Sequence, residues 1–229
     1  MDFRIKNIWR LEIGGLEIWI TQTIINTWIL MLLLIAAAVV VRVKFRKFTE
    51  IPEKFQNVIE AIVEIFDNFL IDVVGEKLSY LGNWFFMVFV FILTSNLSGV
   101  LGFRPPTADW VTTFAFAFST LLLIQIVGVK HRGMEYLQSF FKPNPIFFPL
   151  NVIGELARPI SLSFRLFGNI LSGLIIMTML YTLAPIYVRV LIPVPLHAYF
   201  DVAIGALHTY IFCVLSMTFV GAASIPSDM

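Results

Sequence analysis

Five long apolar stretches dominate the pattern of hydrophobic and polar positions along the chain. They cover residues 18–41, 84–101, 112–129, 151–183 and 198–223. Each is long enough, at roughly 18 residues or more, to cross the apolar core of a lipid bilayer as a helix. The pattern therefore predicts an all-α integral membrane protein with at least five membrane helices.

The last two stretches are longer than one perpendicular crossing requires. At a rise of ~1.5 Å per residue, residues 151–183 would form a helix of about 50 Å and residues 198–223 one of about 39 Å, while the apolar core is about 30 Å thick. We therefore expect both helices to be long and tilted, the first steeply, or else to bend.

Two other segments are expected at the membrane without crossing it. Residues 52–83 open with Pro52 and place apolar residues on one side of a helical period, which is typical of an amphipathic interfacial helix. Residues 139–149 contain Pro143, Pro145 and Pro149, which predicts a proline-broken re-entrant segment.

The chain contains no internal repeat, and it is expected to form a single membrane domain, 1–229. Its expected parts are an N-terminal region with the first helix (1–51), the amphipathic segment (52–83), a transmembrane hairpin (84–133), and the re-entrant segment with the two long helices (134–229).

Positive charge predicts the orientation in the membrane. Basic residues follow the first stretch at 42–47 and the third at 130–132. Such clusters stay on the cytoplasmic side, which places the N-terminus outside and the C-terminus in the cytoplasm. Residues 24–35 and the alanines after them also resemble a signal peptide, but the apolar run continues to Val41 and meets the basic cluster. The segment is therefore interpreted as a retained anchor.

Composition excludes several classes of function. The chain is 59% hydrophobic and 14% charged, and its mean hydropathy of +0.87 is that of a protein in lipid. Sixteen Lys and Arg against fifteen Asp and Glu leave no basic excess for nucleic acid. The single cysteine, Cys213, can form neither an internal disulfide nor a Cys-rich metal site. Motifs of hydrolases and nucleotide-binding enzymes are missing, so no catalytic residue, metal or cofactor is expected.

Polar residues recur along the fourth stretch at helical spacing. They are Arg158, Ser161, Arg165, Asn169 and Ser172, which a helix places on one face. An arginine in mid-membrane costs at least about 2.5 to 3.5 kcal/mol on insertion scales, so Arg165 needs a partner or a water-filled cavity. It could serve an ion pathway, or it could form an interhelical salt bridge that only fixes packing. Arg158, nearer the helix start, is expected to extend to the headgroups.

The last stretch carries two titratable residues on one face. Asp201 and His208 lie seven residues apart, with Gly205 between them. Together they could relay a proton, because histidine titrates near neutrality and burial can raise the pKa of an aspartate. Alternatively, His208 could hydrogen-bond a neighbouring helix and Asp201 could be a solvated helix-start residue. His131 is expected in the basic inner loop and His197 in a Pro-rich outer loop, and neither shows a partner in the sequence.

The sequence PISLSFRLFGNIL at 159–171 closely resembles the signature of subunit a of F-type ATP synthases, particularly the bacterial and chloroplast forms. Further similarity extends over most of the chain outside the first twenty residues. It includes Phe55-Gln56-Asn57 with Glu60, Ser95-Asn96-Leu97 with Gly99, and Pro106-Thr107-Ala108-Asp109.

The resemblance implies an ion-translocating subunit without nucleotide chemistry of its own. Arg165 would be the stator arginine that discharges the carboxylates of a rotating ring of c subunits, which two half-channels reach from opposite sides. The partners implied are this c-ring, the b subunits of the peripheral stalk, the rest of the ATP synthase and the lipid of a bacterial inner membrane. The ion-pathway residues would be Arg165, Asn169, Asp201, His208, Glu155 and Ser161, and the ring-facing residues Leu162, Ser172 and Gly173.

Two positions depart from the family pattern. Nine residues after the arginine, where many relatives have glutamate, stands Leu174, and His208 takes the place of a glutamine. The outer half-channel is therefore expected to be rebuilt around Asp201 and His208, and Glu155 is the candidate for the inner mouth. Two rival hypotheses are an independent transporter that binds an anionic solute at Arg165, active without partners, and a structural scaffold that tolerates substitution of Arg165.

Overall fold

The computed structural model describes residues 7–13, 16–45 and 54–225. Within these residues five helical segments are long and apolar enough to cross a membrane, which confirms the number predicted. They are α1 (Gln22–Phe45), η1 with α3 and η2 (Glu76–Leu101), α4 (Trp110–Arg132), η4 with α6 (Pro145–Leu183), and α8 with η5 and α9 (Pro193–Ser224).

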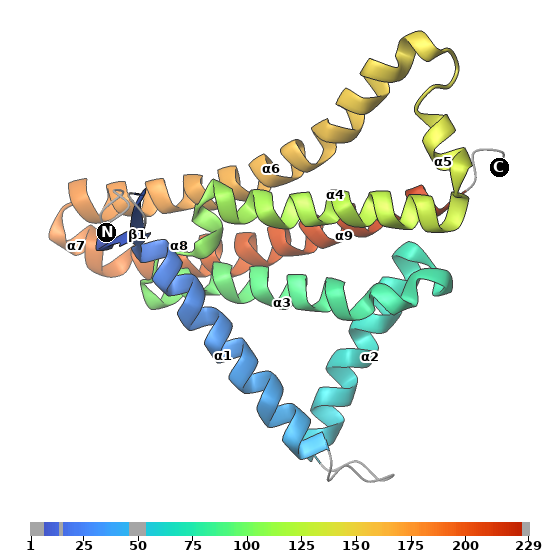
Figure 1. Cartoon of the computed structure of the whole chain (residues 1–229). Helices are drawn as coiled ribbons and strands as arrows, with labels where there is room; N and C mark the ends of the chain where they lie inside the picture. Colours follow the sequence, from blue (N-terminus) through green and yellow to red (C-terminus); the bar gives the residue numbers. More distant parts are fainter. Residues whose placement is uncertain (1–6, 14–15, 46–53, 226–229) are drawn as a thin grey trace.

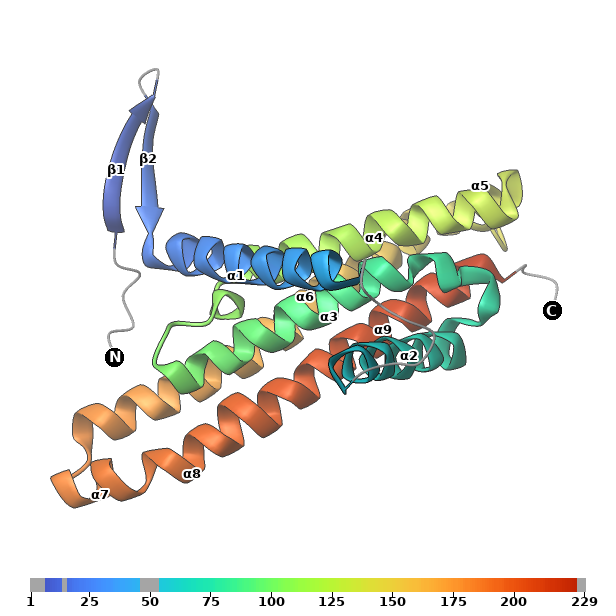
Figure 2. The ribbon, with the colours of Figure 1, turned by 90° about the horizontal axis from the view of Figure 1, so that it is seen from below.

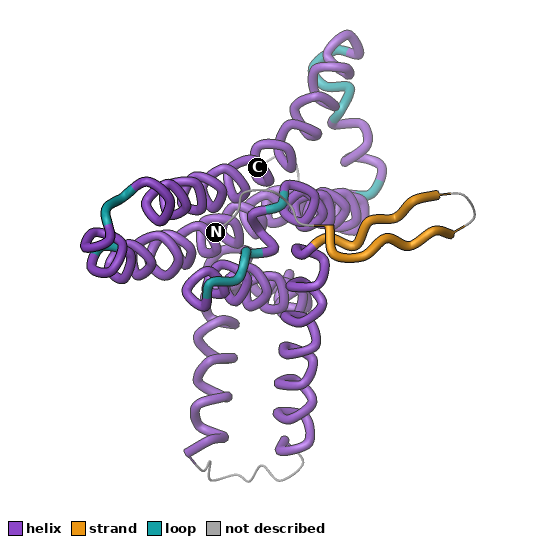
Figure 3. The backbone as a smooth tube through the Cα atoms, turned by 90° about the vertical axis from the view of Figure 1, so that its left-hand side faces the viewer, coloured by secondary structure: helices purple, strands orange, loops and turns teal. Residues whose placement is uncertain are grey.

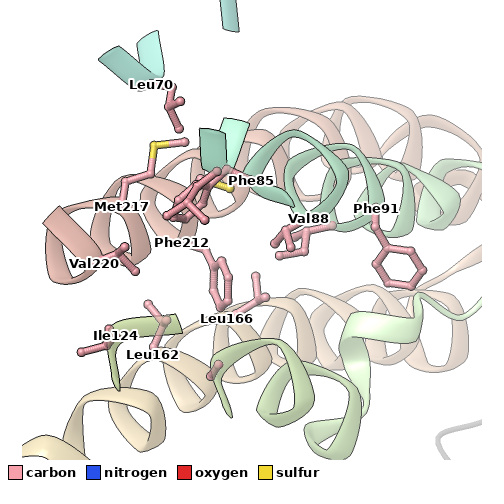
Figure 4. Close-up of a cluster of buried hydrophobic side chains, with 14 of the residues drawn as sticks. Leu70, Phe85, Val88, Phe91, Ile124, Leu162, Leu166, Phe212, Met217 and Val220 are labelled. Carbon is pink, nitrogen blue, oxygen red and sulfur yellow. The ribbon is translucent and has the colours of Figure 1, made fainter. Parts of the chain in front are cut away.

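Four helices form the body of the molecule. α3 (Gly82–Leu97), α4, α6 (Phe148–Leu183) and α9 (Gly205–Ser224) lie side by side (Figure 1). Their facing sides bury a cluster of large apolar side chains drawn in Figure 4, with Phe85 of α3, Ile124 of α4, Leu166 of α6 and Phe212 of α9 among its members. The body therefore presents two distinct ends, where polar groups can gather.

We name the two ends after the short helices that lie there, α7 and α5 (Figure 1). The α7 end comprises α7 (Ile186–Leu191), α8 (Pro193–His197), the π-helical segment η5 (Ala198–Ile204) and the turn that holds η2 (Ser98–Leu101) and η3 (Pro106–Ala108). The α5 end comprises α5 (Met134–Ser139), η4 (Pro145–Phe147) and the ends of α4 and α9.

The helix α6 is long, as the sequence predicts, and it contains 36 residues. Figure 1 shows that it changes direction along its course, from the raised part near α5 to the part that follows α4 and α9. Pro159 lies inside the helix, where it has no N–H to donate to the preceding turn. This bend lets one helix belong to both ends of the molecule.

The predicted proline-broken segment is a connection between α5 and α6. It does not form a span of its own: α5 and η4 are short, and a turn joins them. Asn151 secures this turn, because its side-chain Nδ2 donates to the carbonyls of Phe140 at 2.8 Å and Lys142 at 3.0 Å.

Two helices extend away from the body (Figure 3). α1 contacts chiefly α3, β2 and η3, and no residue of its most apolar window is buried in this chain. α2 (Lys54–Val74) is the predicted amphipathic helix, and it buries Phe66 and Leu70 against the body while Val58 and Ile65 are exposed. Pro52, its predicted start, lies outside the described residues.

One element was not predicted. Residues Asn7–Ile13 (β1) and Leu16–Thr21 (β2) form an antiparallel hairpin, so α1 begins at Gln22 and not at residue 18. The apolar residues of β2 extended the apolar stretch in the sequence, because hydropathy alone does not distinguish a strand from the first turn of a membrane helix.

Candidate functional site

Arg165 lies on the exposed side of α6, in the middle part of the helix. Among the described residues it forms no ion pair and no hydrogen bond with a side chain of this chain. The interhelical salt bridge considered from the sequence is therefore not made within the described part of the chain. The guanidinium is left available to a group that another molecule supplies.

The polar face of α6 divides into two sets. Ser161, Arg165, Gly168 and Ser172 are exposed and follow one another at spacings of four, three and four residues. Asn169 is half-buried and turns toward α9. A surface of small residues around one arginine therefore runs along the outside of α6, and we call these four residues the arginine face.

The structure contradicts two residues of the predicted ring-facing set. Leu162 is only 3% exposed, and Gly173 is buried beside Phe200, whose Cβ lies 3.5 Å from the position of a Cβ at residue 173. Both therefore face the interior of this chain. They were assigned to the ring-facing stripe by helical spacing, but at ~100° per residue Leu162 and Gly173 lie ~60° and ~80° around the helix from Arg165, on the side that this chain covers.

Asn169 connects the arginine to α9. Its Nδ2 lies 3.2 Å from Nδ1 of His208, and His208 is close enough to Arg165 for an electrostatic interaction. The alternative considered for His208, a hydrogen bond to a neighbouring helix, is what the structure shows, because Asn169 belongs to α6. The imidazole of His208 is therefore within electrostatic range of the exposed guanidinium, and Asn169, one turn after Arg165 on α6, contacts this imidazole.

A second polar group lies nearer the α7 end. Nδ1 of His197 is 2.5 Å from Oδ2 of Asp201, and Nε2 of the same imidazole is 3.1 Å from the hydroxyl of Tyr181. His197 and Asp201 are each less than one fifth exposed. Asp201 is therefore not the freely solvated helix-start residue considered from the sequence, because a histidine holds it within the protein.

A cavity of about 20 Å³, lined by Asn96, Asn169, His197 and Asp201 among other residues, connects the two polar groups. This is room for about one water molecule. Gly99 forms part of the wall, and a Cβ at that position would lie 2.8 Å from Cγ of Asp201. The absence of a side chain at residue 99 is what admits the carboxylate.

Asn96 fixes the wall of this cavity through buried hydrogen bonds. Its Nδ2 donates to the carbonyl of Gly205 at 2.9 Å and to Oγ1 of Thr209 at 3.1 Å, while Oγ1 of Thr107 donates to its Oδ1 at 2.6 Å. A Cβ at Gly205 would lie only 3.0 Å from Cβ of Asn96. The buried amide of Asn96 thus has hydrogen-bond partners at both Nδ2 and Oδ1, and these bonds hold α3 and α9 in one register.

The α5 end holds a different arrangement around Glu155. Its Oε2 pairs with Nη1 of Arg158 at 2.7 Å, and its Oε1 accepts from the hydroxyl of Tyr136 at 3.4 Å. Arg158 also lies over the ring of Phe219. It was expected to extend alone toward the headgroups, but a carboxylate one turn earlier provides a nearer partner.

These groups border an open cavity of about 360 Å³, lined also by Arg132 and Asn151. Burial, and then the charge of Glu155, raises the pKa of Tyr136 to about 12. The hydroxyl therefore keeps its proton at physiological pH and remains a donor to Glu155. Of the α6 residues that line the cavity, Arg158 is the nearest to Arg165 along the chain.

Comparison with known proteins decides the family. The profile of the family described as "ATP synthase A chain" matches residues 24–221. The chain belongs to the ATP synthase A chain family. This confirms the resemblance first seen at residues 159–171, and together with the five spans it makes the chain an integral membrane protein.

Individual members of the ATP synthase A chain family are similar over nearly the whole chain. ATP synthase subunit a of Moorella thermoacetica is 38% identical, over 91% of this chain and 92% of the relative. ATP synthase subunit a 2 of Acaryochloris marina is 33% identical, over 90% and 86%. A relative named "ATP synthase subunit a, sodium ion specific", from Propionigenium modestum, is 35% identical, over 88% and 73%.

Three residues of this site, His197, Tyr181 and Tyr136, were not predicted from the sequence. His197 was expected in a loop, although the helical segments α8 and η5 continue through this residue and put Asp201 one turn later. The spacing of four residues was a usable signal once a helix was assumed. Tyr181 and Tyr136, in contrast, are brought to His197 and Glu155 only by the packing of separate segments.

Proposed function

We propose that this chain is the ion-translocating stator subunit a of an F-type ATP synthase, and that Arg165 discharges the carboxylates of the c-ring. The observation that carries the proposal is the exposed position of Arg165 on the arginine face, without a carboxylate partner among the described residues. An unpaired guanidinium at membrane depth is costly, and a passing carboxylate relieves that cost.

The strength of such a pair suits a repeated exchange. A guanidinium and a carboxylate about 4 Å apart attract by roughly 1 to 4 kcal/mol between aqueous and near-surface conditions. This favours the ionised carboxylate, so the ion leaves as each ring site arrives, yet the pair can separate again. Each charge that crosses gains about 2.3 kcal/mol per 100 mV, which drives the rotation.

On this proposal the α7 end holds the outer half-channel. His197 and Asp201 receive the ion, the small cavity carries it past Asn169, and His208 delivers it beside Arg165. The separation of Asp201 from His208 is bridged by Asn169, which lines the cavity with the first residue and bonds the second. The carboxylate at Asp201 supplies the acidic group that is absent at Leu174.

The α5 end holds the inner half-channel in the same proposal. Its open cavity reaches Glu155 and Arg158, and Ser161 of the arginine face lies one turn beyond. The small side chains of Ser161, Gly168 and Ser172 allow close approach of a c-subunit helix. The N-terminus then lies outside and the C-terminus in the cytoplasm of a bacterial inner membrane, with b subunits as further partners.

Substitution of Arg165 tests the proposal. Arg165→Ala and Arg165→Gln enzymes should assemble but lose ATP synthesis driven by an ion gradient, because no fixed cation discharges the ring. Reconstituted vesicles with an imposed gradient provide the measurement. Arg158→Gln is the matched control: this arginine is on the same helix but already paired with Glu155, so most of the activity should remain. Normal synthesis by Arg165→Ala would refute the assignment.

A further inference from the structure

The hairpin β1–β2 stands apart from the helical body. Figure 2 shows it leaving sideways from the start of α1, not continuing along the axis of that helix. An isolated two-stranded hairpin is marginally stable in water, so a surface that supports it is expected.

The pairing register gives the hairpin two unlike sides. Arg10 pairs with Trp19 and Glu12 with Glu17. Arg10 forms ion pairs with both glutamates, at 2.9 Å for Glu12, and lies over the ring of Trp19 at 5.5 Å from its centroid. The charges on this side therefore neutralise one another and leave a net charge of −1.

The alternate positions of the two strands are all apolar. Their register pairs are Trp9 with Ile20, Leu11 with Ile18, and Ile13 with Leu16. Because successive residues of a strand alternate between its faces, Trp9 and Ile20 lie on the side opposite the ion pairs. Trp9 is 71% exposed, whereas Ile20 opposite it is 8% exposed, so the indole is presented where this side of the hairpin joins α1.

The apolar side of the hairpin adjoins the exposed apolar surface of α1. The hairpin leads directly into α1, whose most apolar window has no buried residue in this chain and whose Trp28 is also exposed. A spanning helix that begins at Gln22 places the adjoining hairpin at the level of the headgroups. Tryptophan is enriched at that level, because its ring is apolar and its N–H can reach polar groups.

We propose that the hairpin lies in the membrane–water interface at the α7 end, with its apolar side against the lipid of that leaflet and its ion-paired side in water. It anchors the start of α1 and fixes the depth of that helix. The occupant of the apolar side is the headgroup and upper acyl region of the bilayer. The inference does not depend on the role of Arg165.

Spin labels on the assembled ATP synthase test this proposal. Labels are attached to Trp9→Cys and to Glu12→Cys in a Cys213→Ala background, with Leu32→Cys on the exposed side of α1 as the lipid reference. The enzyme is placed in nanodiscs of phosphatidylcholine and phosphatidylglycerol. At residue 9 collisions with oxygen should exceed those with a water-soluble nickel complex, as at residue 32. At residue 12 the nickel complex should dominate.

Two results would overturn the proposal. Equal access of nickel to residues 9 and 12 would mean that the hairpin stands in water. Shielding of residue 9 from both reagents would mean that a protein subunit or a second copy of this chain covers it.

Brominated phosphatidylcholine provides a measurement without labels. It quenches tryptophan fluorescence on contact, so Trp9→Phe should reduce the lipid-quenched signal of the enzyme more than Trp19→Phe does. An equal or smaller reduction for Trp9→Phe would refute the proposed placement even if the labelled variants assemble poorly.

Discussion

The polar groups at the α7 end surround a cavity of about 20 Å³, whereas those at the α5 end border one of about 360 Å³. At the α7 end His197, Asp201, Asn169 and His208 follow one another, two pairs of them in hydrogen-bond contact. At the α5 end Glu155 and Arg158 stand at the edge of an open space. On the proposed function, one end passes an ion between side chains and the other passes it through water.

Because of this difference, titratable residues at the two ends should not be equally important for ion passage. An ion that passes through a space for about one water molecule must use each titratable side chain that lines it, and the wall atoms determine its route. In a wide cavity a single carboxylate adjusts the local charge, but solvent can bypass it. Substitutions at the α7 end should therefore reduce ion passage much more than substitutions at the α5 end.

Among the substitutions that test this comparison, Asp201→Asn is expected to reduce ion conductance the most. The variant keeps the shape of the side chain but removes the titratable group bonded to His197, so passive ion conductance should fall roughly 100-fold, the lower range for loss of a positioned proton-transfer group. The measurement uses vesicles that contain the membrane sector without its catalytic heads, at pH 5 to 9, with H⁺ and Na⁺ tested in turn. Asp201→Glu is the control: it keeps the acidic group but adds a methylene to the tight cavity, so it should conduct better than Asp201→Asn. Wild-type conductance of Asp201→Asn at every pH would exclude Asp201 from the path.

One Gly→Ala substitution at each end adds a methyl group there and compares how tightly the two cavities are packed. In Gly99→Ala the new Cβ would meet Asp201 Cγ at 2.8 Å, well inside the separation of ~3.5 Å at which carbon atoms pack, so the carboxylate must move. Conductance should drop about tenfold, in line with an overpacking cost of ~1–3 kcal/mol. Gly154→Ala, at the open cavity, meets no atom within 4 Å and should conduct normally. Equal effects of the two variants would contradict the comparison.

His208 should depend on polarity more than on charge. Gln at this position can still bond Asn169, so His208→Gln should conduct within about threefold of wild type, less than the ~1 kcal/mol of one hydrogen bond. His208→Leu leaves the amide of Asn169 without that partner and should lower conductance roughly tenfold, about 1.4 kcal/mol. The same vesicle assay measures both. A large and similar loss in both variants would show that the titratable imidazole itself is required.

The smallest effect is expected from Glu155→Gln. The open cavity persists, and solvent screens the ion pair at Arg158, which is 43% exposed, although Glu155 is only 12% exposed. Taking the ~0–1 kcal/mol of a screened pair, conductance should remain within about threefold. Tyr136→Phe, which removes the hydroxyl donor to Glu155, is the matched control and should behave alike. A tenfold or larger loss in Glu155→Gln alone would make this carboxylate an obligatory step of the inner path.

The sequence by itself determined the membrane helices and the helical face that carries Arg165. Both follow from local properties: an apolar run of sufficient length crosses a bilayer, and a spacing of three or four residues selects one face. The family follows from the residues around Arg165 as well. None of these conclusions requires knowledge of which helices are neighbours.

Only the tertiary structure decided which side of each helix meets another helix. Leu162 and Gly173 proved to be buried because α4, α9 and Phe200 cover that side, and His197 gained its partners because a helix continues where a loop was expected. The hydropathy of residues 18–21 was equally compatible with a strand. Side-chain partners come from segments far apart in the chain, and their packing cannot be derived from hydropathy or spacing within one segment.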